Sequence, residues 1–379
     1  MLVTEGEQRS VVAACRSLAR AGFEVVVAAG RRPAAAHWSR ACHVPLRIAD
    51  PGERPDCFVA ELESVVRDGG FEVLVAGGER SLLSISERRD VLEPHVELGL
   101  PDHHAVLRSL DKLALLDAAS GAGLDPPLTK VCADASDAHR AVRTLGLPVV
   151  IKPRRSVLRS SNQLRQCGIS VVTRRADLDD AVAAVELPAI VQRFEDQAHR
   201  LSTAGVMTDE GVLGFVAIRF LRTWPPQAGA VCFAETVPVP VGLAERVENL
   251  LDALGWRGIF ELEILELGAA RLAAIDLNPR IFGWLALAIA AGADLPRLWI
   301  ELLAGERPKR EEAVAGVRYR WEEADLAHFL WQLRRASLRR AAEVVRPRTH
   351  VVHAHFRAHD PGPLVARALE LARRTSPRR

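Results

Sequence analysis

The chain has 379 residues, in which 50 lysines and arginines face 48 aspartates and glutamates. A formal charge of +2 gives no overall field for nucleic acid, and 49% hydrophobic with 26% charged residues is typical of a globular protein with a large core. No apolar run is long enough for a membrane span. From the charge we expect no nucleic-acid partner, and from the apolar runs we expect no membrane partner. The six scattered cysteines and the lack of a signal-like N-terminus favour a reducing, cytoplasmic setting.

Short apolar strands alternate with amphipathic helices in the first hundred residues. Residues 1–4 and 24–29 are strand-like, and the residues between them show helical apolar spacing up to Gly22. A helix at residues 57–66 and a strand at residues 72–76 repeat the pattern. This alternation predicts a βαβ unit with a parallel sheet, although the first strand–helix turn lacks the glycines of a dinucleotide fingerprint.

A second unit begins near residue 109. A helix is expected at residues 109–119, a Pro-Pro pair then breaks the chain, and strands are expected at residues 128–132 and 148–152 around a helix. Residues 154–168 are polar and basic, which predicts an irregular segment before a further strand and helix.

The third unit is rich in strands. Apolar runs between residues 190 and 237 predict several strands, and a helix is expected at residues 243–254. Strands at residues 259–266 and 271–278 predict a hairpin, which an apolar helical stretch follows. The tail is expected to be helical apart from an extended piece at residues 350–356.

The predicted hairpin carries a cluster of acidic and amide side chains. A simple register sets Glu263 opposite Asp276, and the same register sets Glu261 opposite Asn278. Because alternate residues of a strand share a face, all four side chains project together, and a hard divalent cation would offset their charge. The alternative is an acidic, solvent-facing strip on an edge hairpin.

Three basic residues are candidates for contacts with phosphate. Arg280 follows the acidic strand, and its guanidinium suits a phosphate or a carboxylate. Only four of the fifty basic residues are lysine, and arginine does not replace lysine as a compact point charge. Lys112 in LDKLALL and Lys152 in PVVIK are therefore functional candidates, with an ordinary surface position as the alternative for each.

The segment DLNPRIFGWLALAIAAGADLP resembles the [DE]-x-N-P-R stretch and following helix of the ATP-grasp superfamily, of the carbamoyl-phosphate-synthetase-like kind. With the VIKP and D-K segments, the resemblance covers residues 1 to about 305. It implies an α/β (α+β) ATP-grasp fold. The expected parts are an N-terminal Rossmann-like pre-ATP-grasp domain at residues 1–108, a small lobe at 109–187, a large lobe with the metal site at 188–305, and a helical C-terminal extension at 306–379.

The resemblance also implies roles for the hairpin residues. Glu263 and Asp276 would bind Mg²⁺ or Mn²⁺, and Asn278 would complete the site. Glu261 is the alternative to Glu263, because the loop between the two strands varies in length in the family. Arg280 would steady the γ-phosphate or the acyl phosphate.

The nucleotide contacts implied by the resemblance come from several segments. Lys112 and Lys152 would contact the phosphates of ATP. The segment IVQRFEDQAHRLS resembles the strand that links the two lobes, where backbone groups meet the adenine edge. The residues expected there are Gln192, Arg193, Phe194 and Glu195.

Two further contacts are expected around the triphosphate. Relatives usually carry a glycine-rich flap after the strand lysine, but this chain has RRSVLRSSNQLRQCG, so Ser160 would replace amide contacts with a side-chain contact. Arg222 is expected over the triphosphate, with an exposed strand arginine as the alternative. The histidines of VHAHFRAHDPGPL are expected on a strand that closes the fold rather than at a metal site.

The function implied by the resemblance is that of a carboxylate–amine ligase. ATP would phosphorylate a small-molecule carboxylate, and an amine would then displace the phosphate; amino acids are among the candidate substrates. One alternative is an ATP-dependent carboxylase or carbamate-phosphorylating enzyme, and another is a non-catalytic nucleotide-binding regulatory module. A homodimer is an assembly that the resemblance allows.

Overall fold

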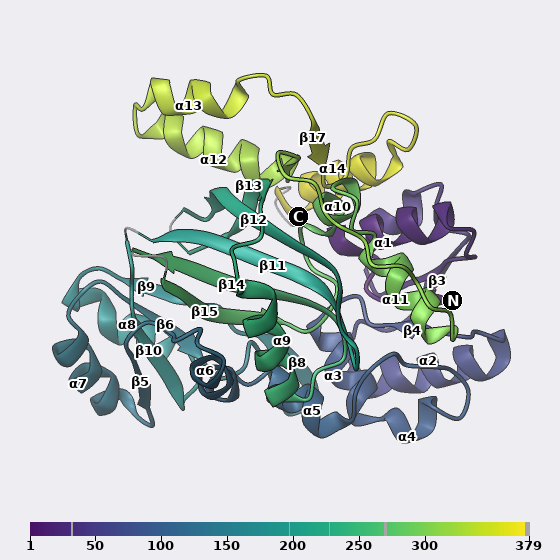
Figure 1. The fold of residues 1–379 in the computed structure, drawn as a ribbon, viewed down its shortest axis with the longest axis horizontal. Coiled ribbons are helices and arrows are strands. Elements are labelled where there is room, and N and C mark those ends of the chain that lie inside the picture. Colours follow the sequence, from purple (N-terminus) through teal and green to yellow (C-terminus); the bar gives the residue numbers. More distant parts are fainter. Residues whose placement is uncertain (32, 197, 227, 269–270, 376–379) are drawn as a thin grey trace.

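The computed structural model describes residues 1–31, 33–196, 198–226, 228–268 and 271–375. Its N-terminal part is a parallel sheet in the order β3-β2-β1-β4, which confirms the expected βαβ pattern (Figure 1). The strands are β1 (Leu2–Val3), β2 (Val26–Ala29), β3 (Val44–Arg47) and β4 (Leu74–Val75). The helices are α1 (Arg9–Arg20), η1 (Ala35–Trp38), α2 (Pro55–Gly69), α3 (Glu79–Glu87), α4 (Arg89–Leu92) and α5 (His103–Ser109). Strand β3 was not predicted, because it contains a proline and is mostly exposed.

The second part is an antiparallel sheet in the order β5-β10-β6-β9. Its strands are β5 (Thr129–Cys132), β6 (Val149–Pro153), β9 (Ser170–Val172) and β10 (Ala189–Arg193). The helices α7 (Ala135–Leu145), η2 (Arg175–Asp177) and α8 (Leu178–Ala183) belong to this part, whereas the preceding helix α6 (Lys112–Gly121) packs against α9 (Leu243–Leu254) and β15 (Arg271–Asn278). Strand β10 belongs to this sheet although it follows residue 187, where we expected the small lobe to end.

The segment expected to be irregular is instead a two-stranded hairpin of β7 (Val157–Ser160) and β8 (Gln163–Gln166). It lies against the N-terminal part, because the buried Leu164 donates its N–H to the Gly52 carbonyl at 2.8 Å and Arg159 pairs with Glu87. Its polar and basic side chains hid the strand pattern, since β7 has only Val157 and Leu158 as apolar residues and β8 has only Leu164.

The third part is a seven-stranded sheet in the order β15-β14-β11-β12-β13-β16-β17, whose long strands lie at the centre of Figure 1. Its strands are β11 (His199–Thr208), β12 (Gly211–Trp224), β13 (Ala230–Val237), β14 (Gly258–Leu267), β15 (Arg271–Asn278), β16 (Arg318–Arg320) and β17 (Val351–His353). Neighbours are antiparallel except β16 and β17. Helices α9 (Leu243–Leu254), α10 (Leu285–Ala290) and α11 (Leu295–Leu303) pack against it.

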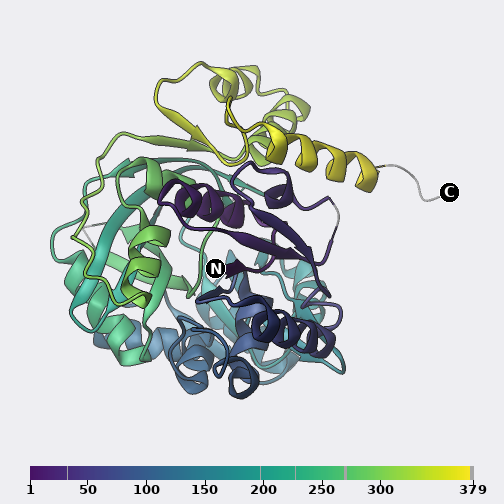
Figure 2. The same cartoon turned by 90° about the vertical axis from the view of Figure 1, so that its right-hand side faces the viewer.

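The C-terminal residues contribute both sheet and helix. Strands β16 and β17 extend the seven-stranded sheet, so part of the expected extension is built into the central sheet. The helices α12 (Glu322–Arg334) and α13 (Leu338–Val345) form a pair beyond β13, and α14 (Gly362–Thr375) lies against η1 of the N-terminal part (Figures 1 and 2). Among the described helices, none is both long and apolar enough to cross a bilayer.

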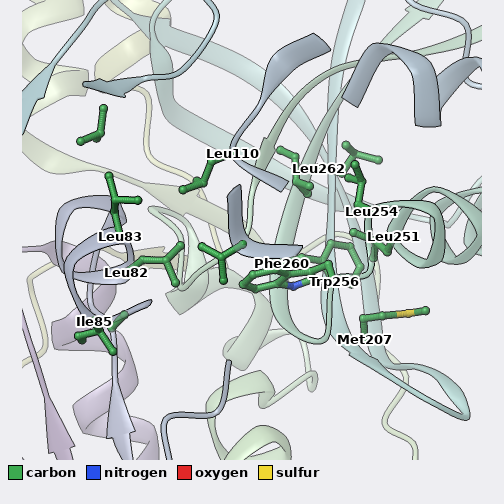
Figure 3. Close-up of a cluster of buried hydrophobic side chains, with 14 of the residues drawn as sticks. Leu82, Leu83, Ile85, Leu110, Met207, Leu251, Leu254, Trp256, Phe260 and Leu262 are labelled. Atoms are coloured by element: carbon green, nitrogen blue, oxygen red, sulfur yellow. The ribbon is translucent and has the colours of Figure 1, made fainter. Parts of the chain in front are cut away.

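One large hydrophobic cluster joins the N-terminal part to the seven-stranded sheet (Figure 3). It brings Leu82 of α3 and Leu254 of α9 together with Trp256 and Phe260, all fully or almost fully buried. Because such cores are close-packed, this cluster fixes the N-terminal sheet relative to the strands that carry the acidic residues.

Candidate active site

A cavity of about 480 Å³ lies where the four-stranded antiparallel sheet, the seven-stranded sheet and the start of α1 meet. Its volume is within the range of small-molecule sites. Most of the predicted site residues line it: Lys112, Lys152, Gln192, Arg193, Phe194, Glu195, Glu261, Glu263, Asp276, Asn278 and Arg280.

The hairpin of β14 and β15 positions the acidic side chains. Glu263 pairs with Asp276 and Glu261 pairs with Asn278, so the predicted register is confirmed. All four side chains border the cavity, and Glu261 is buried. The hairpin face is therefore the floor of a cavity and not a solvent-facing strip.

Lys112 is held at the first turn of α6. Asp111 caps this helix by accepting a hydrogen bond from the backbone N–H two residues later at 2.9 Å. Lys112 Nζ lies 2.9 Å from Asp276 Oδ1 and donates to Ser156 Oγ at 2.9 Å. Burial opposes both charges, but the ion pair outweighs it, so the pKa of Lys112 is raised and the pKa of Asp276 is lowered.

Lys152 reaches the cavity from the other sheet, because alternation along β6 turns Val150 and Lys152 to the same side. Its Nζ donates to the Ile275 carbonyl at 3.1 Å. A bulge in the β14–β15 ladder leaves Ile275 without a residue directly opposite, which explains why its carbonyl can accept this bond. Burial lowers the pKa of Lys152 to about 8 despite the nearby Asp276. A ligand that brings negative charge would therefore stabilise the protonated lysine.

The two glutamates of β14 have different surroundings. Glu263 Oε2 accepts a hydrogen bond from Arg200 Nη2 at 2.6 Å at the edge of the cavity. Burial, with Glu263 nearby, raises the pKa of Glu261 to about 7. Both oxygens of Glu261 accept hydrogen bonds, from Ser202 Oγ, Trp284 Nε1 and Asn278 Nδ2. Glu261 is thus fully engaged with neighbouring side chains, whereas Glu263 is open to the cavity.

The strand β10 contributes the expected adenine side of the cavity. The backbone N–H of Arg193 donates to the Leu128 carbonyl at 2.8 Å, and that of Phe194 donates to the Pro148 carbonyl at 3.1 Å. β10 is a central strand, so its neighbours already use these two groups. The expected backbone pairing with adenine is therefore corrected for these two N–H groups. Backbone carbonyl groups and the N–H of Glu195 are the groups that could still bind adenine.

The start of α1 forms another wall of the cavity, through Gln8, Arg9 and Ser10. Arg9 Nε donates to the Gly283 carbonyl at 3.0 Å, and the guanidinium lies 3.7 Å from the centre of the Trp321 ring. A Cβ at position 283 would lie 2.1 Å from Arg9 Nη2, so a larger residue there would displace the guanidinium from its present position. Arg9 therefore joins the N-terminal part to the loop that follows Arg280.

Two predicted contacts lie away from the cavity. The register of β12 shifts on both sides of Arg222, and this residue instead makes a two-pronged ion pair with Asp325 of α12 at 2.7 and 3.0 Å. Ser160 is exposed at the end of β7. The structure thus corrects the expected triphosphate contacts of Arg222 and Ser160, and the serine that meets Lys112 is Ser156.

The acidic face of the hairpin has carboxylate oxygens that could bind a divalent cation. Among the described residues, no three His, Cys, Asp or Glu side chains are grouped closely enough to hold a metal by themselves. Glu263 and Asp276 lie opposite each other, and one oxygen of each forms an ion pair with a cationic side chain. Their other oxygens, Glu263 Oε1 and Asp276 Oδ2, have no partner within the described ranges. This donor set fits Mg²⁺, which is usually held by one or two carboxylates and completed by phosphate oxygens and water.

Sequence reasoning missed Arg9, Ser10, Ser156, Arg200 and Trp284 at the cavity. A signal existed for the start of α1, because ligands of α/β sheets often bind at the carboxyl ends of parallel strands. Arg200 had no local signal: it meets Glu263 only because β11 and β14 are neighbours in the sheet although they are far apart in the chain.

Comparison with solved structures gives matches over most of the chain. N5-carboxyaminoimidazole ribonucleotide synthetase from Thermus thermophilus is 16% identical, with a TM-score of 0.62 over 84% of this chain and 81% of that chain. N5-carboxyaminoimidazole synthase from Aspergillus clavatus, in complex with ADP and 5-aminoimidazole ribonucleotide, is 13% identical, with a TM-score of 0.61 over 82% and 79%. Biotin carboxylase from Campylobacter jejuni is 14% identical, with a TM-score of 0.61 over 81% and 72%. Neither protein-family models nor curated proteins gave a match.

Likeness at this low identity establishes the fold. The chain has the mixed α/β ATP-grasp fold, as the resemblance in its sequence implied. Its solved neighbours include complexes with ATP and with ADP.

Proposed function

We propose that the chain is an ATP-dependent carboxylate–amine ligase that forms an amide or peptide bond through an acyl phosphate. The main support is a set of cations in the cavity that form no ion pair with a carboxylate among the described residues. In the described part of the chain, the hydrogen bonds of Arg9, Lys152 and Arg280 go only to neutral groups. Three such cations in one cavity suit a triphosphate that lies beside a carboxylate.

The proposed reaction has two steps. A carboxylate oxygen attacks the γ-phosphorus of ATP, the bond from that phosphorus to the β–γ bridging oxygen breaks, and ADP leaves. The amine nitrogen then attacks the acyl carbon, the bond from that carbon to the phosphate oxygen breaks, and the nitrogen loses a proton as phosphate departs. Both steps depend on positioning and charge stabilisation and need no protein nucleophile.

The residues divide this work by their surroundings. Lys152 and Lys112 would hold phosphate oxygens, and Arg280 would orient the carboxylate and the transferred phosphoryl group. Glu263 and Asp276 would hold Mg²⁺ or Mn²⁺, which would neutralise charge on the phosphates. Behind them, Glu261 and Asn278 are hydrogen-bonded to each other at 3.1 Å and keep the hairpin face in place.

The solved neighbours favour a second candidate, an ATP-dependent carboxylase or carbamate-phosphorylating enzyme, since those named above are a carboxylase and carboxyaminoimidazole-forming enzymes. Bicarbonate would then replace the organic carboxylate. Action in the cytoplasm and assembly as a homodimer stay predictions from the sequence.

ADP release with pools of small carboxylates and amines, each with and without bicarbonate, tests the proposal. The ligase requires an organic acid for ADP release and an amine for product. ADP release that needs only bicarbonate and an acceptor would support the carboxylase instead. Mg·ATP binding without turnover in any pool would contradict both enzymes and leave the regulatory module.

A further inference from the structure

The amino end of α1 opens into the cavity. This helix has 12 residues, and Gln8 precedes it without a side-chain cap. The backbone N–H groups of Arg9 and Ser10, at the first two positions of the helix, have no hydrogen-bond partner in the described ranges. Free N–H groups and the helix dipole make such an end favourable for an anion.

Ser10 is a second and independent sign of a ligand at this end. The residue is only 4% exposed, and it lines the cavity. Its hydroxyl has no hydrogen-bond partner in the portion of the chain that the structure describes. The hydroxyl oxygen is not among the buried side-chain atoms that lack a partner, so it is accessible from the cavity and can donate to a ligand oxygen there.

The charges around this end also favour an anion. Arg9 borders the cavity and has no acidic partner among the described side chains. The two glutamates of the preceding turn are engaged elsewhere: Glu5 accepts from the Ser81 hydroxyl at 2.5 Å, and Glu7 accepts from the Arg31 N–H at 2.6 Å. Neither glutamate lines the cavity.

We propose that the carboxylate substrate carries a second anionic group, a carboxylate or a phosphate, which binds at the start of α1 through Ser10, Arg9 and the free N–H groups. The assignment of the first carboxylate to Arg280 rests on the proposed function. Arg9 contacts Gly283, three residues after Arg280, so both anion-binding groups border the same end of the cavity. The substrate is therefore a short acid, with its two charges a few carbon atoms apart.

Calorimetry on the full chain, with ADP and Mg²⁺ present, tests this without turnover. The probes are dicarboxylates from malonate to adipate, each with its monocarboxylate of equal length, and phosphoglycolate and 3-phosphoglycerate for the phosphate case. At least one dianion should bind about tenfold more tightly than its monoanionic counterpart. The series that contains it identifies the second group.

Two variants locate the subsite. Ser10→Asp places a carboxylate where the helix dipole tolerates it, so the fold should persist while the preference for a dianion disappears. Ser10→Ala should weaken that preference about threefold. His104→Asp, which adds the same charge at the second position of α5 on an exposed residue, should keep it.

The inference is overturned if no dianion binds better than its monoanion, or if Ser10→Asp keeps the wild-type preference. Equal ADP release with monocarboxylates and dicarboxylates would also overturn it while leaving the ligase intact. Selective dianion binding without ADP release would instead support the subsite and count against the ligase.

Discussion

At the scale of single residues, the partner of each buried lysine decides its role. Lys112 has Asp276 at 2.9 Å, and its pKa is raised, so its charge already has a partner before any phosphate binds beside it. Lys152 bonds to a carbonyl group, and burial lowers its pKa to about 8. The structure thus leaves Lys152 as the lysine whose charge a nucleotide would complete.

The low pKa of Lys152 predicts pH-dependent nucleotide binding. Because only protonated Lys152 attracts phosphate, the Kd of a non-hydrolysable ATP analogue should rise above pH 8, by up to about tenfold per pH unit. Lys152→Arg should flatten the profile, since arginine stays charged. A wild-type Kd that is constant from pH 7 to 9.5 would contradict this role.

The same lysine affects stability with the opposite sign. Between pH 8 and the usual lysine pKa of 10.5, the unfolded chain binds a proton at Lys152 that the folded protein has lost. The contribution of Lys152 to the free energy of unfolding should therefore increase with pH across this window when no nucleotide is bound. The measurement is denaturation of the wild type and of Lys152→Met at pH 7.5 and at pH 10. The free energy of unfolding of the wild type, relative to that of Lys152→Met, should be higher at pH 10 than at pH 7.5. A lower relative value at pH 10 would contradict the prediction.

Residue-level predictions succeeded where the contact is local in sequence. Glu263 and Asp276 belong to one hairpin, so the sequence indicated that they lie close together, although their direct pairing also depends on a bulge at Ile275 that the simple register did not include. Arg200 and Arg9 reach the cavity through neighbours distant in the chain, and no local pattern reports such contacts.

At the scale of elements, the ion pair of Arg222 and Asp325 attaches α12 to the central sheet. Asp325 also lies 3.0 Å from Arg320 of β16, and His328 of α12 contacts the Thr223 carbonyl at 3.2 Å. The pair is largely buried, with side-chain exposures of 14% and 4%. Arg222 therefore holds an element in place rather than a phosphate.

Removing this pair should cost stability and leave chemistry nearly intact. Arg222→Ala should lower the free energy of unfolding by about 3 kcal/mol, because it leaves Asp325 buried with less compensation. Arg219→Ala, on the same strand with a more exposed partner, should cost about 0.5 kcal/mol. Denaturant titration gives both values. An Arg222→Ala protein with wild-type stability but without turnover would contradict the structural role and support the triphosphate contact first expected for Arg222.

Element predictions depended on the length and strength of the apolar pattern. Helix α9 was predicted with its observed bounds, since four leucines and Val247 line one face between two glycines in the left-handed region. The hairpin β7–β8 and strand β16 were missed, because strands of three or four residues with one or two arginines each carry little periodic signal.

At the scale of the whole molecule, the C-terminal segment is tied back to the N-terminal part. Asp360 accepts hydrogen bonds from Arg16 Nε at 2.7 Å, Ser39 Oγ at 2.7 Å and the Arg40 N–H at 3.0 Å. Burial opposes the charge, but these donors outweigh it and lower the pKa of Asp360. Alternating elements predicted the N-terminal parallel sheet, and the sequence resemblance implied the ATP-grasp fold. This closure instead joins residues more than 300 apart and had no sequence signal.

Asp360→Asn should destabilise the protein in a pH-dependent manner. At pH 7 the loss should be about 2 kcal/mol, because an amide replaces a charged acceptor of three donors. A lowered folded pKa gives stability that is present above the usual aspartate pKa of 3.8 and lost below it. The difference between variant and wild type should therefore shrink below pH 4. A difference that stays constant down to pH 3 would contradict the assignment.

The central claim is that Glu263 and Asp276 hold a cation against the phosphates of a nucleotide in this cavity. The direct measurement is the calorimetric Kd of a non-hydrolysable ATP analogue with and without Mg²⁺. The wild type and Glu266→Gln, a control on the same strand that does not line the cavity, should bind at least tenfold more tightly with Mg²⁺. Glu263→Gln and Asp276→Asn should lose that gain; binding that ignores Mg²⁺ in the wild type, or a full gain in either variant, would contradict the account.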